Sequence, residues 1–294
     1  MFEGIITPIV TPFNRDDEET INIEAMHKLV DHLISHGISG IFPMGSNGEF
    51  HVLDSKEKMY FAKEVIKYVD KRVPVYIGTG ACSTKEAVKL SKEAEKLGAD
   101  ALSVITPYFI KPSEDELVEY YTKIANSVNI PIILYNIPKN TGVNISKEVL
   151  KRLSKISNIQ GIKDSSGDLN NLRDYIEVTK GTNVHVLVGS DSKILKGLSM
   201  GASGAIAGTS NLITDTLVEL YKEYEQGNVK RAEQLQQDIE PLRAALKLGT
   251  VPSILKRSIE LAKIADVGPA RKPVSVTTSE VDKEIKQMLN HYGI

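Results

Sequence analysis

The feature that most constrains this chain is a set of short, nearly continuous apolar runs separated by longer amphipathic stretches. Strands of a parallel sheet are buried on both faces and therefore read as unbroken apolar segments. Eight such runs occur in order: Gly4–Phe13, Gly40–Gly45, Val73–Gly80, Ala101–Pro107, Pro131–Pro138, Ile159–Ser165, Val184–Asp191 and Gly204–Ser210.

The stretches between these runs have helical periodicity and the residues that begin and end helices. Serines stand at three expected starts, Ser55, Ser113 and Ser146, and glycines at three expected ends, Gly37, Gly98 and Gly201. Strict strand–helix alternation allows a closed barrel or a doubly wound sheet. Because Gly78-Thr79-Gly80 lacks the third glycine of a dinucleotide-binding loop, the sequence favours an α/β fold of the (β/α)8 TIM-barrel type.

The chain continues past the eighth predicted helix, Asn211–Gln226, as a helical appendage. Three further helices are expected there, over Val229–Leu248, Pro252–Ala265 and Ser279–His291. We therefore predict a barrel domain over 1–226 and a C-terminal helical bundle over 227–294 that packs on it. No linker or low-complexity tract separates the two parts.

Composition excludes several classes of function. The net charge of −2 and the absence of a basic run argue against a nucleic-acid partner, and no apolar run is long enough for a membrane span. A single cysteine, Cys82, and an N-terminus unlike a signal peptide predict a cytoplasmic protein. His27, His32 and His36 fall on one predicted peripheral helix, where a solvated face is the favoured interpretation, so no metal site is expected.

In a barrel of this kind the active site lies at the C-terminal ends of the strands. Lys163 interrupts the sixth run, and burial favours the neutral amine that attacks carbonyl groups. The alternative is a lysine that points outward with its stem along apolar surface. Tyr135 ends the fifth run, beside the sixth, where its hydroxyl could move a proton or simply belong to the core.

Other strand ends are rich in small and polar residues. Gly45-Ser46-Asn47-Gly48-Glu49 offers backbone N–H groups and side chains to an anion, with Glu49 able to tie the loop down, although a plain turn is the alternative. Tyr108 ends the fourth run. Residues expected to contact the substrate are Asn47, Gly48, Asn140, Ser165, Gly189, Asp191 and Ile206.

Three motifs resemble the family of dihydrodipicolinate synthase and N-acetylneuraminate lyase: Gly45–Glu49, Tyr135–Pro138 and Gly161–Asp168. The resemblance runs from Gly4–Phe13 to Arg271–Pro273. It implies a cofactor-free lyase in which Lys163 forms a Schiff base with pyruvate and Tyr135 moves protons. It further implies that Ser46 and Asn47 hold the carboxylate, that Tyr108 reaches the neighbouring subunit's site, and that the protein is a homotetramer.

Departures from the family pattern bear on the aldehyde partner. Dihydrodipicolinate synthases carry an arginine where Asn140 stands and two threonines at Ser46-Asn47, while sialic acid lyases carry a glutamate where Ser192 stands. The residues are closer to aldolases of 4-hydroxy-2-oxoglutarate and of 2-keto-3-deoxy sugar acids. We therefore expect retro-aldol cleavage of a 4-hydroxy-2-oxo acid. The alternatives are 4-hydroxy-tetrahydrodipicolinate synthase, which uses pyruvate and aspartate semialdehyde, N-acetylneuraminate lyase, and a non-enzymatic sensor of 2-oxo acids.

Overall fold

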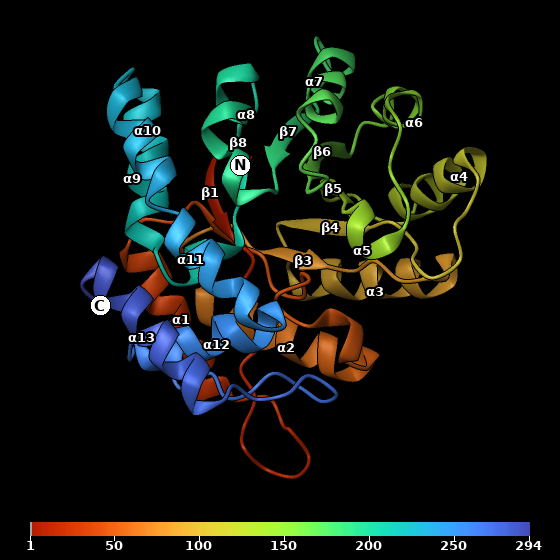
Figure 1. The fold of residues 1–294 in the computed structure, drawn as a ribbon. Helices are drawn as coiled ribbons and strands as arrows, with labels where there is room; N and C mark the ends of the chain where they lie inside the picture. Colours follow the sequence, from red (N-terminus) through yellow and green to blue (C-terminus); the bar gives the residue numbers. More distant parts are fainter. Residues whose placement is uncertain (1) are drawn as a thin grey trace.

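The computed structural model describes residues 2–294 and contains eight parallel strands arranged as a nearly closed barrel (Figure 1). The strands pair in the order β2-β1-β8-β7-β6-β5-β4-β3, and a parallel bridge between Ile41 and Val75 brings the two ends of the sheet together. Their bounds are β1 Gly4–Thr7, β2 Gly40–Ile41, β3 Tyr76–Gly78, β4 Ala101–Ile105, β5 Ile132–Asn136, β6 Ile159–Asp164, β7 His185–Val188 and β8 Gly204–Ile206. The (β/α)8 prediction is confirmed.

The strands are shorter than the apolar runs that predicted them. The first run, Gly4–Phe13, contributes a strand that ends at Thr7, directly before Pro8. Proline has no N–H to give to a ladder, which is one reason for the strand to end there. The rest of the run stays buried as irregular chain, and so apolar residues beyond the strand ends form the walls around the barrel mouth.

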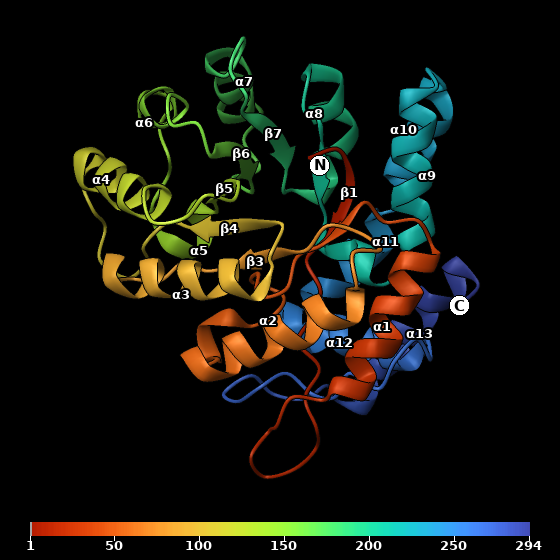
Figure 2. The ribbon, with the colours of Figure 1, turned by 180° about the vertical axis from the view of Figure 1, so that it is seen from behind.

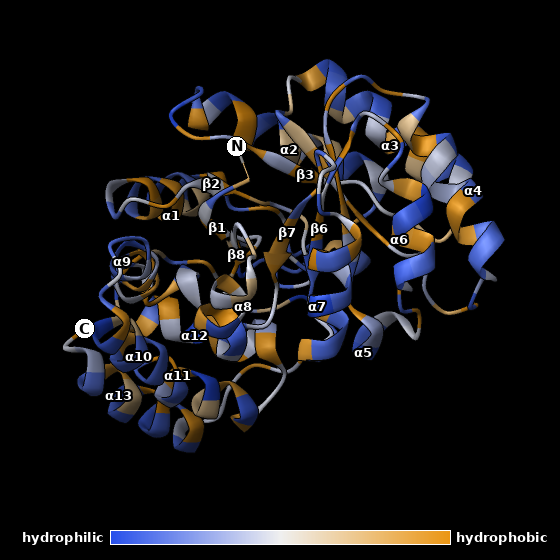
Figure 3. Ribbon diagram, turned by 90° about the horizontal axis from the view of Figure 1, so that it is seen from above, coloured by the Kyte–Doolittle hydropathy of each residue, from blue (hydrophilic) through white to orange (hydrophobic). Residues whose placement is uncertain are grey.

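Helices separate the strands and surround them (Figure 2). They are α1 Ile23–Ser35, α2 Ser55–Val69, α3 Thr84–Leu97, α4 Glu114–Ala125, α5 Pro138–Thr141, α6 Lys147–Leu153, α7 Leu169–Val178, α8 Ile194–Met200 and α9 Thr214–Glu225. Figure 3 shows hydrophilic and hydrophobic segments alternating along these helices, as expected when one face packs on the barrel.

Two of the three predicted helix starts are confirmed and the third is corrected by one residue. Ser113 and Ser146 are N-caps as predicted, but α2 is capped by Asp54, which forms a capping box with Glu57. Ser55 is instead the first helical residue, and its hydroxyl contacts Glu86. The short helix α5 was not predicted, and it carries Asn140.

The C-terminal appendage is helical, but its first predicted helix is divided. Val229–Leu248 forms α10 Val229–Gln237, α11 Glu240–Ala245 and a short 3-10 turn, because Pro241 cannot donate within a continuous helix. The segment ends with α12 Val251–Leu261 and α13 Ser279–Tyr292, which lie on the side of α1 and α2 in Figures 1 and 2. Because α10 packs directly against α9, the contacts between helices do not separate the two parts. The domain boundary at 226/227 therefore stays a prediction.

Within residues 2–294, the structure has no helix with both the length and the apolar character that a membrane crossing would need. The cytoplasmic location stays a prediction.

Gly197 tests the packing between the helices and the barrel. Replacing a helical glycine by alanine ordinarily stabilises a helix by about 1 kcal/mol. Here the added Cβ would lie 2.3 Å from Val188 Cγ2 and 3.0 Å from Leu172 Cδ2, two buried side chains with no room to move. We expect Gly197→Ala to lower the free energy of unfolding by about 1–3 kcal/mol, measured by urea denaturation.

The matched control is Lys196→Ala, at the exposed residue directly before Gly197 on the same helix. It should change the free energy of unfolding by less than about 0.5 kcal/mol. Stabilisation by Gly197→Ala would contradict the close packing of α8 on β7.

Candidate active site

A cavity of about 840 Å³ opens at the C-terminal ends of the strands. Among its walls are ten of the eleven residues that the sequence singled out: Ser46, Asn47, Tyr108, Tyr135, Asn140, Lys163, Ser165, Gly189, Asp191 and Ile206. The barrel thus brings together side chains that lie far apart in the sequence. The exception is Gly48, which is not part of the cavity wall.

Lys163 points into this cavity from β6. It pairs in register with Tyr135 of β5 and Leu187 of β7, and only 4% of its surface is exposed. Its Nζ lies 3.9 Å from the centre of the Tyr135 ring and 5.2 Å from that of Phe42. Within the described chain no carboxylate forms an ion pair with it. The amine is therefore surrounded by aromatic faces rather than by a counter-ion.

The hydroxyl of Tyr135, whose ring lies beside this amine, reaches the loop after β2. It lies 3.1 Å from Ser46 Oγ, at a distance where either group can donate. Tyr135 is itself buried and its ring meets Phe42 edge to face. The tyrosine and serine hydroxyls therefore form a hydrogen-bonded pair through which a proton can pass, next to the lysine.

The loop Gly45–Phe50 is held in an unusual backbone conformation. Met44 has φ 58° and Glu49 has φ 56°, both in the left-handed region that non-glycine residues rarely occupy. Gly48 faces the barrel rather than the cavity: a Cβ there would lie 3.0 Å from both Ile9 O and Met44 N, and its carbonyl accepts a hydrogen bond from Thr11. Gly48 therefore allows close backbone approach and does not meet the cavity.

The same loop leaves two donors free. The N–H groups of Gly48, Glu49 and Phe50 are used within the loop, donating to Gly45 or Ser46 carbonyls. For the N–H groups of Ser46 and Asn47, residues 2–294 supply no acceptor in the structure. Two adjacent N–H groups, with the Ser46 hydroxyl and the Asn47 amide, suit a carboxylate.

Buried polar side chains fix the ends of β5 and β6. Asn136 Nδ2 donates to Asp164 Oδ1 at 3.0 Å and its Oδ1 accepts the N–H of Ile145. Asp164 also accepts the N–H and the hydroxyl of Ser166. These bonds hold the residues next to Tyr135 and Lys163, so they set the positions of both side chains.

Asp191 braces the opposite wall. Its carboxylate accepts the N–H groups of Gly208 and Thr209, at 3.3 and 2.8 Å. Its carbonyl accepts from Gln236 Nε2 of α10 at 3.0 Å. The predicted ligand contact is therefore accompanied by a structural role that the sequence did not reveal, and it involves the C-terminal segment.

Tyr108 lies in the cavity of its own chain, with its ring edge to face against Phe50. Burial raises the pKa of its phenol to about 12. The neighbouring Phe109 is instead 92% exposed and has φ 76°. Phe109 is therefore the exposed aromatic side chain here, and the expected reach of Tyr108 into a neighbouring subunit stays a prediction.

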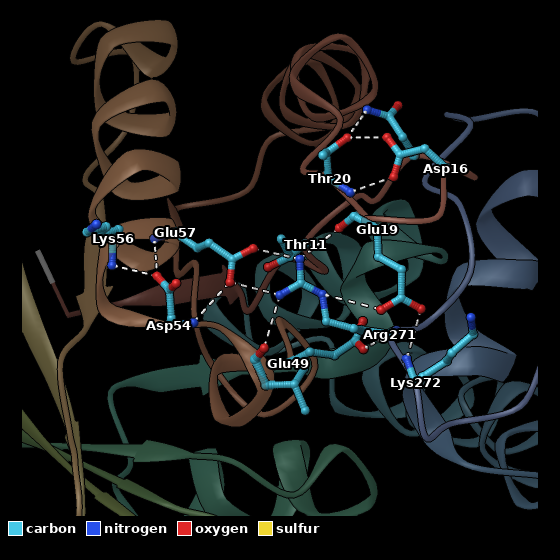
Figure 4. Close-up of polar contacts among 12 residues, drawn as sticks. Thr11, Asp16, Glu19, Thr20, Glu49, Asp54, Lys56, Glu57, Arg271 and Lys272 are labelled. Carbon is cyan, nitrogen blue, oxygen red and sulfur yellow. Dashed lines mark hydrogen bonds and ion pairs between the residues drawn. The ribbon is translucent and has the colours of Figure 1, made fainter.

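Sequence reasoning did not find the charged cluster behind the loop. Glu49 does accept a backbone donor, as anticipated, and that donor is Arg271 at 2.9 Å. The Arg271 guanidinium donates to both carboxylate oxygens of Glu57 and to Glu19 O (Figure 4). It also donates to Val52 O. The other partner of Glu49 is Lys256, whose only sequence signal is a charge on the apolar face of the predicted helix Pro252–Ala265.

Metal ligands do not gather here. In the described part of the chain no three side chains among the histidines, cysteines, aspartates and glutamates lie close enough to hold an ion. The rings of His32, on α1, and of His36, its C-cap, are tilted by 34° with their centres 4.1 Å apart, and neither residue lines the cavity.

Comparison with known proteins gives a consistent result over the whole chain. The model of the dihydrodipicolinate synthetase family matches residues 1–292. A 4-hydroxy-tetrahydrodipicolinate synthase from Methanoculleus marisnigri is 35% identical, with all of both chains covered. The structure of YagE from E. coli K12, a prophage protein of the dihydrodipicolinic acid synthase family in complex with pyruvate, has a TM-score of 0.95 and 33% identity, covering 100% of this chain and 99% of that one.

A solved structure described as the first monomeric dihydrodipicolinate synthase variant also matches, with a TM-score of 0.94, 29% identity, and 99% and 97% of the two chains covered. The resemblance drawn from the three motifs is thereby confirmed. The chain belongs to the dihydrodipicolinate synthetase family, whose members are lyases that bind pyruvate as a Schiff base on a lysine and need no metal.

Proposed function

We propose that Lys163 forms the Schiff base with pyruvate and that a carbon–carbon bond is made or broken at the pyruvate methyl carbon. The observation that carries this proposal is the Lys163 amine, buried at the cavity without a carboxylate partner and 3.9 Å from the Tyr135 ring centre. The neutral amine is the nucleophile toward a carbonyl carbon, and no carboxylate of the described chain holds this amine in an ion pair.

The chemistry follows from the groups around that amine. The Lys163 nitrogen adds to C2 of pyruvate, and loss of water from the adduct leaves a protonated imine. This imine accepts the electron pair released when a proton leaves C3, which gives the enamine that attacks an aldehyde carbon. The centre of the Tyr135 ring lies 3.9 Å from the amine, and the Tyr135 hydroxyl is hydrogen-bonded to Ser46. Tyr135 is therefore the group that would carry these protons.

The carboxylate of pyruvate would lie against the loop after β2. The N–H groups and side chains of Ser46 and Asn47 supply donors at one point, which fixes the orientation of the carbonyl carbon toward Lys163. This placement requires both residues and the lysine to line one cavity, as they do.

Borohydride trapping tests the lysine directly. Reduction with pyruvate present should leave a pyruvate-derived adduct on the peptide that contains Lys163, and Lys163→Ala should abolish it. Tyr135→Phe should slow adduct formation by about 100-fold, since it removes a general acid–base group. Peptide mass mapping measures both.

The matched control is Lys139→Ala, an exposed lysine on α5 beside the cavity. It should leave the adduct unchanged. An adduct that persists in Lys163→Ala, or none in the folded wild type, would contradict the proposal.

Two aldehyde partners are candidates. The names of the curated relatives support condensation with aspartate semialdehyde, as in 4-hydroxy-tetrahydrodipicolinate synthase, over the retro-aldol reaction that the motifs predicted. The charges around the cavity support an aldehyde without a second carboxylate, as in the cleavage of a 4-hydroxy-2-oxo acid or a sugar acid. Of the described lysines and arginines only Lys163 and Arg271 line the cavity, and the two terminal nitrogens of the Arg271 guanidinium donate to Glu57 and to two backbone carbonyls.

Asn140 is the position from which a free cation could be supplied. It is exposed on α5 at the cavity wall. We expect Asn140→Arg to raise kcat/KM for aspartate semialdehyde, relative to glyceraldehyde, by about tenfold, because it adds a partner for the second carboxylate. Product analysis of the wild type with each aldehyde identifies the natural candidate.

Asn126→Arg adds the same charge at the exposed C-terminal end of α4 and should leave the ratio unchanged. An unchanged ratio in Asn140→Arg would show that a carboxylate on the aldehyde does not reach α5.

We propose that the chain forms a homotetramer. The support within this chain is a pair of exposed apolar side chains beside the cavity, Phe109 at 92% and Ile110 at 74% exposure, since such pairs mark contact surfaces. The match to a monomeric variant makes sedimentation of the purified protein the deciding measurement.

A further inference from the structure

The loop that carries Ser46 and Asn47 needs support from outside itself. Glu49 holds a left-handed backbone conformation although it has a side chain, and such strain persists only where the surroundings enforce it. The Glu49 N–H donates to Ser46 O, and the Glu49 carbonyl accepts from Val52. Any rotation at Glu49 would therefore move the two residues proposed to hold the carboxylate.

Each carboxylate oxygen of Glu49 has a partner in the C-terminal segment. It is 1% exposed, its Oε1 lies 2.6 Å from the Lys256 ammonium, and its Oε2 accepts the backbone N–H of Arg271. Both partners belong to the C-terminal segment, on α12 and on the chain that follows it. The contacts of Glu49 with Lys256 and Arg271 thus join parts of the chain that are more than two hundred residues apart.

Lys256 is a fully buried residue with several contacts of its own. Its side chain is fully buried, its Nζ donates to Pro269 O at 3.0 Å, and it lies 4.0 Å from the centre of the Phe13 ring. The Arg271 guanidinium lies 4.4 Å from the same ring centre. Burial lowers the pKa of Lys256 to about 8, even with Glu49 opposite, so the buried charge is held at a cost.

We propose that Lys256 is a positioning residue for the 2-oxo acid: through Glu49 it holds the loop that presents Ser46 and Asn47, which makes helix α12 a working part of the active site. This inference rests on the proposed function, because it assumes that the loop binds the pyruvate carboxylate.

Replacing Lys256 with methionine tests the inference. Methionine keeps much of the side-chain length and removes the ammonium. In Lys256→Met the pyruvate concentration that gives half-maximal borohydride trapping at Lys163 should rise about tenfold, because misplaced binding groups weaken ground-state and transition-state binding together. The trapping rate at saturating pyruvate should stay within about threefold of wild type, since Lys163 and Tyr135 are untouched.

Arg257→Met is the matched control. Arg257 is the next residue on α12, and its guanidinium pairs with Asp282 and Glu260 instead of the loop. The variant loses a charged, paired side chain from the same helix, so a purely structural effect of such a loss would appear in both variants. The half-saturating pyruvate concentration should stay within about twofold of wild type in Arg257→Met, as expected when no binding group moves.

The outcomes separate the two proposals. Wild-type trapping at Lys163 establishes the proposed function, and its absence would remove that function before Lys256 is considered. With trapping established, an unchanged half-saturating concentration in folded Lys256→Met would overturn the positioning role, as would an equal shift in Arg257→Met.

If Lys256→Met does not fold, the pair Glu49→Gln with Lys256→Met removes both buried charges at once and avoids leaving one of them alone. A raised half-saturating concentration in this double variant supports the role, and wild-type affinity overturns it.

Discussion

The structure depends on the closure of a parallel sheet. Each strand has N–H and C=O groups on both edges, and these groups must find partners when they are buried. The bridge between Ile41 of β2 and Val75, the residue before β3, brings the two edge strands of the sheet order together and so nearly closes the barrel. Because all strands are parallel, their C-terminal ends meet at one rim. Residues as distant in sequence as Ser46, Tyr135, Lys163 and Asp191 therefore share one cavity.

The electrostatics of the barrel rim depend on which charged side chains are buried when the barrel closes. A charged lysine is costly to take out of water unless a counter-ion pairs with it. Lys163 has aromatic rings and a tyrosine hydroxyl nearby, whereas Asp164, next in sequence, points to Asn136 and Ser166. Adjacent residues on a strand point to opposite faces. The alternation therefore puts the amine in the cavity and its neighbouring carboxylate outside it, which leaves the amine available for reaction.

The sequence was sufficient for features that depend on local pattern. Apolar runs predicted all eight strands. Lys163 and Tyr135 were noticed as polar residues at the ends of buried runs, but their roles were inferred only through the family resemblance. Features that depend on contacts between distant segments were missed. Nothing near Lys256 in the chain shows that Glu49 will face it, and nothing near Asp191 indicates Gln236. The division at Pro241 is different: its signal was present, and helical periodicity on both sides outweighed it.

The buried pair Glu49–Lys256 bears on how the C-terminal segment should be regarded. Removing one member of such a pair costs about 3–5 kcal/mol, yet replacing both with apolar residues is often neutral or stabilising, so stability alone does not explain its presence. An apolar pair could fill the same volume, but it could not direct a carboxylate oxygen to the Arg271 N–H while the backbone of Glu49 stays left-handed. Directional bonds fix the loop in one geometry, and a site that binds a small carboxylate needs that geometry. Gln236 makes a similar connection to Asp191 on the opposite wall. Three contacts from the appendage to two walls of the cavity argue that residues 227–294 complete the site, and that a boundary at 226/227 divides the chain in sequence more than in function.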